Sequence, residues 1–449
     1  MKKSWMQRNP WACIDCGDIA VERQQCLDEG KDISSLTEEF DRLEKTDMFS
    51  AEAQRDAGEL LDRTAALLCL DPELQEPSDL TEIQALAKGA PDMPLPEGEA
   101  LSDKFLGAWL GRIAGCTFGK PFEGRRKWMV SKYLKETGNY PPAHYISYRG
   151  VDPELIKECG IPDWTDRICH EHMEKAIPDD DLNYPVVNLV CFKNHGRDFT
   201  PEDVASTWLG YLPFGAVCTA ERVAYKNLCS MVEPPRSACF RNPYREWIGA
   251  QIRADFWGWV SPGKPGQAAE YAWRDACISH VKNGIYGEMW AAAMMAAAFA
   301  TDDVKEVIGA GLAVIPPKSR LARAIENMIV LYDSGISYEA AAEDIASRWN
   351  ENHGHHWCHT ISNAEIVAAA LLWGGKDFSK TVFYSVFPGF DTDCNGATAG
   401  SVLGIMLGGK AIPESWTGPV HDTLETSIAG YNNVKVSEMA RLTEDLSRI

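Results

Sequence analysis

The sequence of 449 residues has no apolar run near the roughly 20 residues that a membrane-spanning helix needs. Its longest apolar candidate, around Met289–Phe299, is much too short. Lys2 and Lys3 near the start are followed by no apolar stretch, which excludes a secretory signal peptide at this end. We therefore expect a cytoplasmic protein without a membrane partner.

Basic residues are also few compared with acidic ones. The chain has 44 Lys and Arg against 65 Asp and Glu, a formal net charge of −21. A surface this negative repels phosphate backbones unless it carries a local basic patch. The two short basic clusters, Lys2–Lys3 and Arg125–Lys127, are too small for that role, so we expect no nucleic-acid partner.

A tight cysteine framework is missing as well. The fourteen cysteines are scattered, which is typical of reduced thiols in a cytoplasm. Cys13 and Cys16 form a lone C-x-x-C, and no second pair follows at the spacing of a zinc site.

Strand signals are scarce, since few segments alternate with period two and β-branched runs are rare. This excludes a doubly wound sheet, which needs strands between its helices. Helical periodicity dominates from Leu101 onward and predicts an all-α domain of many packed helices. The predicted helices span residues 102–116, 182–192, 219–231, 265–282, 287–300, 303–313, 318–334, 338–349, 362–373 and 395–408.

The first hundred residues have the pattern of a separate helical layer. One helix is predicted to begin at Ser35 and another to span Ala51–Leu70. The segment 90–99 is rich in Pro and Gly and is typical of a linker. We therefore expect a helical N-terminal extension with linker over residues 1–98, packed outside a catalytic domain over residues 99–449. Its role in shaping a cleft or an oligomer contact stays open.

Two predicted helices carry glycine at every fourth residue. One has Gly107, Gly111 and Gly115, and the other has Gly400, Gly404 and Gly408. Each glycine weakens a helix by roughly 1 kcal/mol relative to alanine. Such stripes therefore indicate very close helix approach or backbone near a ligand.

Acidic residues gather beside these helices. Glu123 follows the first glycine stripe, Asp179–Asp181 precede an apolar helical face, and Asp391 and Asp393 precede the second stripe. Helix N-termini stabilise carboxylate charge, and loops let carboxylates converge. Converging carboxylates repel unless a cation neutralises them, and all-oxygen ligands suit Mg²⁺, Mn²⁺ or Ca²⁺. Either cluster alone is explained by helix capping, but the two together favour a metal site.

In this order the segments resemble the ADP-ribosylglycohydrolase family. Its hallmarks are a glycine-rich helix ending in Glu, a T-D-D before a helix, and a late D-T-D-T-N before small residues. Here they read as Gly107–Glu123, Asp179–Asp181 and Asp391–Asn395. The resemblance covers about residues 101–410 and leaves the N-terminal hundred residues outside.

The resemblance implies a multi-helix orthogonal bundle and a hydrolase that cleaves a ribosyl bond at its anomeric carbon. It also implies two Mg²⁺ ions, with Mn²⁺ as a substitute, bound to ribose hydroxyls and a water. The lead substrate is a small ADP-ribosyl conjugate or an ADP-ribosylated protein. Glu123 and Asp180 are the expected catalytic residues, and the expected metal ligands are Asp179, Asp180, Asp181, Asp391 and Asp393.

Two positions depart from the family pattern: Asp179 and Cys394 each stand where the family has threonine. A thiol is a poor partner for a hard cation, so we expect Cys394 not to bind the metal. The extra carboxylate of Asp179 would compensate for the lost threonine ligand by adding negative charge to the metal site. Two alternatives stay open: a hydrolase of another furanoside or nucleoside without ADP, and a non-catalytic binder of ADP-ribose or a sugar.

Substrate contacts are expected from three other segments and from the late aspartate motif. Gly249 and Arg253 match the family's G-x-G-x-x-M-R segment weakly. His280 and Tyr286 are candidates for substrate contact, with a structural role in the core as the alternative. The histidine-rich loop 353–359, interpreted as exposed rather than as a zinc site, is expected to edge the cleft. The substrate candidates are Gly249, Arg253, His280, Tyr286, His359, Asn363 and Thr392.

One further T-D-D, at Thr301–Asp303, falls too late in the order of motifs. We expect Thr301 or Asp302 to be the N-cap of the following helix.

Overall fold

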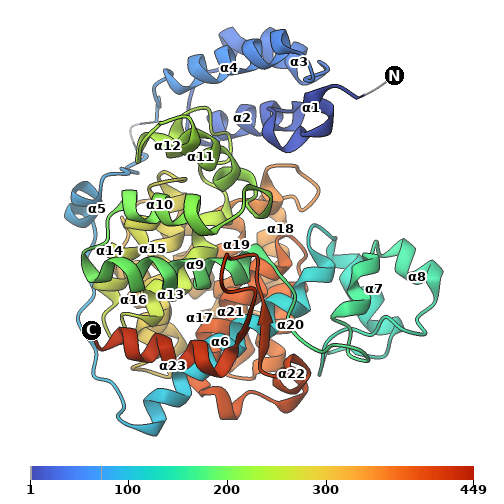
Figure 1. The fold of residues 1–449 in the computed structure, drawn as a ribbon, viewed down its shortest axis with the longest axis vertical. Coiled ribbons are helices and arrows are strands. Elements are labelled where there is room, and N and C mark those ends of the chain that lie inside the picture. The colour runs from blue at the N-terminus through green and yellow to red at the C-terminus, as the bar shows by residue number, and fades with distance from the viewer. Residues whose placement is uncertain (1–2, 72) are drawn as a thin grey trace.

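In the computed structural model, which describes residues 3–71 and 73–449, helices form nearly all the regular structure (Figure 1). The fold is all-α, as the sequence predicts, and a small antiparallel pair of strands is added near the C-terminus. The elements are α1 (Trp5–Arg8), α2 (Cys16–Asp28), α3 (Thr37–Leu43), α4 (Ala51–Ala65), α5 (Leu80–Leu86), α6 (Glu99–Gly119), α7 (Lys127–Glu136), α8 (Pro153–Glu158), α9 (Asp180–His195), α10 (Pro201–Tyr211), α11 (Thr219–Cys229), α12 (Arg236–Cys239), α13 (Ala254–Trp259), α14 (Pro265–Ala276), α15 (Asn283–Ala298), α16 (Val304–Ala313), α17 (Arg320–Asp333), α18 (Tyr338–Arg348), α19 (Thr360–Gly374), α20 (Phe378–Val386), α21 (Thr392–Leu407), α22 (Glu414–Thr417), β1 (Thr423–Glu425), β2 (Asn433–Lys435) and α23 (Val436–Ser447).

The main hydrophobic core surrounds α15, α19 and α21, whose side chains are buried almost all round. A helix this apolar on every face is typical of a protein core or of a membrane span. Even so, none of the helices in the described residues is both long and apolar enough to span a bilayer.

Of the two interpretations of the glycine stripes, the structure shows close helix approach. Helices α6 and α21 run antiparallel, with Gly107 against Gly404, Gly111 against Gly400 and Gly115 against Gly396. A Cβ atom at Gly111 would lie 2.1 Å from the carbonyl oxygen of Gly400, so only glycine permits this approach. Close packing therefore brings the end of α6 to the start of α21.

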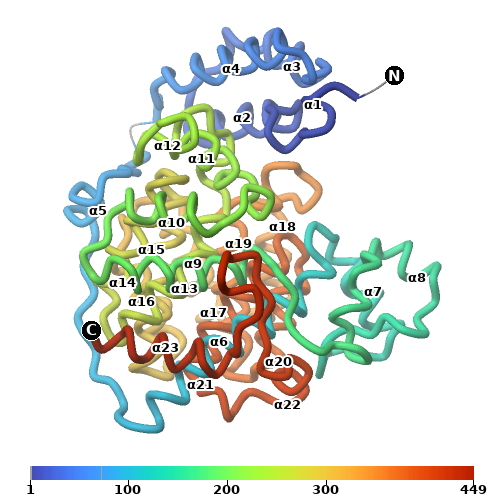
Figure 2. The backbone as a smooth tube through the Cα atoms, viewed as in Figure 1, coloured from blue at the N-terminus to red at the C-terminus, as the bar shows by residue number. Residues whose placement is uncertain are grey.

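The N-terminal helices lie at one end of the molecule (Figure 1). Helices α2 to α4 enclose a small core of their own, which includes Ile19, Phe40, Leu43 and Leu60. Past α5, the chain up to the start of α6 runs without helix along one side of the molecule to its opposite end (Figure 2).

The T-D-D at Thr301–Asp303 caps a helix, but through a different residue than expected. Asp303 is the N-cap of α16, and its carboxylate accepts from the backbone N–H groups of Lys305 and Glu306. The Thr301 hydroxyl donates to Glu306, and exposed Asp302 pairs with Lys376. The N-cap is therefore neither Thr301 nor Asp302, because Asp303, with an extended backbone, directly precedes the first turn.

Candidate metal centre

Two helices begin at the acidic cluster. Asp179 is the N-cap of α9, and its Oδ1 accepts from the backbone N–H of Asp181 at 2.9 Å. Asp391 precedes α21, and Asp393 lies in the first turn of that helix. The free N–H groups and the dipoles of both helix starts stabilise negative charge here.

Backbone contacts hold Glu123 beside Asp391. After α6 the chain turns through Lys120–Phe122, and Gly124 then donates its N–H to the carbonyl of Phe390 at 3.2 Å. Phe390 itself has φ of +66°, a strained conformation for a bulky residue, directly before Asp391. One oxygen each of Glu123, Asp391 and Asp393 lies within 4.8 Å of the others. Three oxygen donors at this spacing suit Mg²⁺ or Mn²⁺.

A second group of donors shares Asp393. One atom each of Asp181, Asp393 and Cys394 lies within 4.8 Å of the others, and all three residues are buried. Asp181 Oδ2 and Asp393 Oδ1 are buried without a hydrogen-bond partner. Burying an unpaired carboxylate oxygen is costly, and a bound cation removes that cost. The donor set therefore fits a metal.

Two cations that the sequence analysis did not select neutralise part of the cluster. Arg112 donates to Asp181 Oδ1 at 3.1 Å and to Asp255 Oδ2 at 2.6 Å, and Lys120 donates to Asp179 Oδ2. Both oxygens of Asp179 thus have protein partners. Arg112 and Lys120 stand inside the motif that leads to Glu123, but only the fold shows which carboxylates they face.

The pKa values of the carboxyls reflect this crowding. Burial raises the pKa of Asp180, Asp181, Asp391 and Asp393, and the neighbouring carboxylates raise it further. Burial acts on Asp179 too, but the Lys120 ammonium and its hydrogen bond lower the pKa of that carboxyl below its usual value. Ionising the whole cluster needs more positive charge than Arg112 and Lys120 provide.

Glu123 is the member of the cluster most open to solvent. Partial desolvation among the site atoms, followed by the charge of Asp391, raises its pKa to about 7. Asp180 is half-buried at the first position of α9. These two carboxyls, the expected catalytic residues, are the ones that solvent can reach.

The seven residues expected to contact substrate are all buried, and their role in substrate binding stays a prediction. Arg253 is fully buried and pairs with Glu221, Asp275 and Glu288, and a Cβ at Gly249 would collide with the Glu221 carboxylate. His280 contacts Ser279, and the Tyr286 hydroxyl donates to the carbonyl of Pro77. These residues stabilise the core because their polar groups are turned to other core residues.

Two of these seven residues, Thr392 and Asn363, hold the segment that carries Asp391 and Asp393 in place. The Thr392 hydroxyl donates to the Gly119 carbonyl at 2.8 Å and so ties α21 to α6. Asn363 accepts from the backbone N–H of Asp391 at 3.2 Å and from the Asn395 amide at 2.8 Å. These side chains fix the aspartate loop and are completely buried.

His359 and His355 are buried, so this part of the histidine-rich loop is not exposed as expected. His355 Nε2 lies 3.0 Å from Asp28 Oδ2, while the Trp247 indole N–H donates to His355 Nδ1 at 3.0 Å. The Ile361 backbone N–H likewise donates to His359 Nδ1 at 3.1 Å. Both Nδ1 atoms therefore accept hydrogen bonds, while His355 Nε2 faces Asp28 and the buried Nε2 of His359 has no hydrogen-bond partner.

This histidine loop links the N-terminal helices to the site. Asp28 ends α2, and Cys358 in the same loop as His355 donates its Sγ–H to Asp391 Oδ2 at 3.2 Å. A continuous chain of contacts thus runs from α2 to Asp391.

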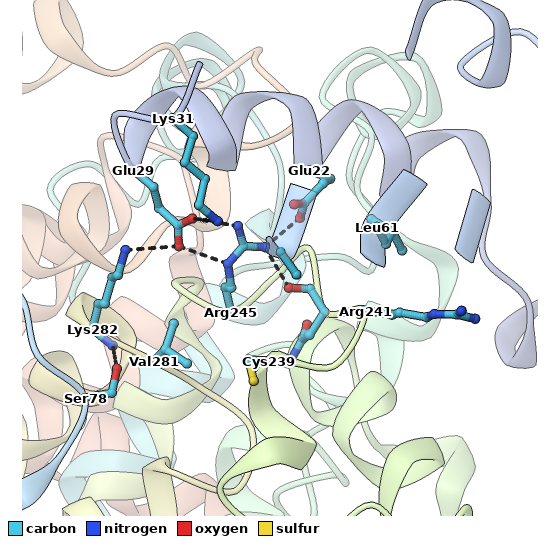
Figure 3. A pocket seen from close by; sticks show the side chains of 12 residues that line it. Glu22, Glu29, Lys31, Leu61, Ser78, Cys239, Arg241, Arg245, Val281 and Lys282 are labelled. Carbon is cyan, nitrogen blue, oxygen red and sulfur yellow. Dashed lines mark hydrogen bonds and ion pairs between the residues drawn. The ribbon is translucent and has the colours of Figure 1, made fainter. Parts of the chain in front are cut away.

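A separate cavity of about 250 Å³ lies between helices α2 and α4 and the segments 239–245 and 281–282 (Figure 3). Glu29 at its wall accepts from Arg245 at 2.8 and 3.0 Å and pairs with Lys31 and Lys282. Glu22 pairs with Arg245 at 2.6 Å. These charges are paired with one another, so the residues of the cavity wall hold the N-terminal helices against the rest of the chain. We call this set of ion pairs, centred on Glu29 and Arg245, the ionic clamp.

Comparison with known proteins places the chain in context. Residues 97–447 match the family model described as ADP-ribosylglycohydrolase. A solved structure titled "ADP-ribosylglycohydrolase-related protein complex" has a similar fold, with a TM-score of 0.50 and 18% sequence identity over 78% of this chain and 99% of that one. No curated protein matches the sequence.

Proposed function

Because this chain belongs to the ADP-ribosylglycohydrolase family, we propose that it hydrolyses the glycosidic bond at the anomeric carbon of a ribosyl group, with an ADP-ribosyl conjugate as lead substrate. The family supports a glycosyl hydrolase activity and is metal-dependent. The observation that carries the proposal is the convergence of Glu123, Asp391 and Asp393 at the start of α21.

The cluster would hold two divalent ions. Glu123, Asp391 and Asp393 form an all-oxygen position for Mg²⁺ or Mn²⁺. Asp393 also belongs to the neighbouring group with Asp181 and Cys394, so it could contribute to holding both ions. Bound ions supply Lewis-acid polarisation at the ribose hydroxyls.

The protein's own residues supply the proton transfer and the electrostatic environment. Glu123, which is exposed, orients the attacking water and accepts its proton, and half-buried Asp180 is the second candidate for this role. Arg112 and Lys120 hold Asp181 and Asp179 in place through ion pairs, and Lys120 keeps the pKa of Asp179 low. The remaining negative charge stabilises an oxocarbenium-like transition state.

One assay tests the proposal. ADP-ribosyl-arginine, an ADP-ribosyl-serine peptide, simple nucleosides and aryl furanosides are incubated with the protein, with and without Mg²⁺. Release of ADP-ribose by the wild type and Asp302→Asn, but not by Asp391→Asn, is the expected result, since exposed Asp302 lies outside the cluster.

Two other outcomes would contradict the proposal. Turnover of the small furanosides alone would move the activity to substrates without ADP. Tight binding of ADP-ribose without turnover of any substrate would identify a non-catalytic binder.

A further inference from the structure

The donor group of Asp181, Asp393 and Cys394 includes a sulfur atom, whereas the neighbouring group of Glu123, Asp391 and Asp393 has oxygen donors only. Its three donor atoms, two carboxylate oxygens and one sulfur, lie within 4.8 Å of one another. Carboxylate oxygens alone suit Mg²⁺, whereas thiolate sulfur favours ions such as Zn²⁺ and Fe²⁺. The two positions that share Asp393 are therefore suited to different ions.

The buried atoms around this position indicate a ligand independently of the cluster itself. Asp181 is completely buried and Asp393 is 3% exposed. Yet Asp181 Oδ2 and Asp393 Oδ1 have no hydrogen-bond partner. Arg112 reaches only Oδ1 of Asp181, so it leaves the other oxygen free for an ion.

We infer that Asp181, Asp393 and Cys394 bind a sulfur-binding divalent transition-metal ion of the Zn²⁺ or Fe²⁺ class, next to a hard ion held by Glu123, Asp391 and Asp393. This inference rests on the metal dependence in the proposed function and differs from the expectation that Cys394 does not bind metal. Three protein ligands leave a coordination position open, as in catalytic rather than structural sites. On binding, the Cys394 thiol loses its proton to solvent and coordinates as thiolate.

Other thiols near the cluster make a specific test necessary. Cys358 donates to Asp391 Oδ2 at 3.2 Å, and Cys116 lies within 4.8 Å of Asp179 and Asp181. Cys229 is exposed at the end of α11 and serves as the control thiol.

The test is a Co²⁺ titration of the reduced, chelator-treated full chain in the presence of Mg²⁺. Co²⁺ bound to thiolate gives a sulfur-to-metal charge-transfer band, while Co²⁺ bound to oxygen alone does not. We expect this band at one equivalent of Co²⁺ and its displacement by Zn²⁺. The band should be absent from Cys394→Ser and Cys394→Ala and unchanged in Cys229→Ser and Cys358→Ser.

Several results would overturn the inference. These are Co²⁺ binding without the band, a band that persists in both Cys394 variants, or a band lost only with Cys358→Ser. Melting temperatures without metal verify that each variant folds. Mg²⁺-dependent release of ADP-ribose without the band would refute the inference alone, while the band without any turnover would refute only the proposed hydrolysis.

Discussion

A Cβ atom on Gly115 would lie 1.8 Å from the carbonyl oxygen of Gly396. This contact lies one turn before the end of α6 and close to the start of α21. The separation between Glu123 and Asp391 therefore depends on glycine pairs that carry no reactive group themselves.

Replacing Gly115 should disrupt both stability and the site. Gly115→Ala is expected to lower the free energy of unfolding by roughly 3 kcal/mol, the upper end of overpacking costs, because the colliding atom is backbone. Urea denaturation measures the loss. The control is Gly309→Ala in α16, where a Cβ meets nothing within 4 Å. It should stabilise the protein by roughly 0.5–1 kcal/mol, since alanine is the better helix former. Equal effects of the two changes would disprove the packing argument.

Metal should stabilise the folded chain. At a Mg²⁺ or Mn²⁺ concentration about 100 times the Kd, the free energy of unfolding should rise by about 2.7 kcal/mol, because only the folded state assembles the site. Melting temperature after chelator treatment is the measurement. Asp393→Asn should remove most of the response, since Asp393 belongs to both donor groups, and Asp302→Ala should retain it. A melting temperature that does not change when metal is added would contradict the proposed metal site.

The ionic clamp should be essential for stability. Glu29→Gln leaves Arg245, Lys31 and Lys282 without the carboxylate that they share. Breaking a buried ion pair on one side typically costs 3–5 kcal/mol, so a loss of about this size is expected in denaturant unfolding. Asp445→Asn, in an exposed pair with Arg441, is the matched control and should cost at most roughly 0.5 kcal/mol. A Glu29 variant as stable as this control would show that the N-terminal helices are held by other contacts.

One buried carboxyl outside the site should give a measurable pH dependence. Burial raises the pKa of Glu365 from 4.5 to about 7, although Arg348 and the Trp349 indole N–H contact it and act in the opposite direction. The folded state therefore holds a proton that the unfolded state has released between these pH values. Its stabilising contribution is complete below pH 4.5 and disappears as the pH rises through 7.

The comparison with Glu365→Gln isolates this group. The stability of the wild type relative to the variant should fall between pH 4.5 and 7, by at most about 1.4 kcal/mol per pH unit. Denaturant unfolding at several pH values measures it. Parallel pH profiles of the two proteins would contradict the raised pKa.

Much of the fold was readable from local patterns. All ten helices predicted from 102–116 to 395–408 correspond to observed helices. The glycine stripes left close helix approach and a nearby ligand open, and the structure shows that α6 and α21 pack against each other. In the N-terminal region, helices appear at the predicted starts near Ser35 and at Ala51, but α2 was not anticipated. The division into an extension over 1–98 and a domain over 99–449 remains a proposal, as do the catalytic and metal-binding roles. The strands β1 and β2 are each three residues long, too short for an alternating pattern to be detected.

The sequence by itself determined most of the helices, the glycine stripes and the acidic residues at helix starts, because each depends on spacing along the chain or on the size of one side chain. Tertiary structure alone decided which ions oppose these acids. Arg112 and Asp181 are 69 residues apart, and Lys120 and Asp179 are 59 apart. It also buried Arg253, His280 and Tyr286 and brought the Cys394 thiol next to two carboxylates. Burial and charge pairing depend on which distant segments meet, and residue spacing within one segment does not encode that.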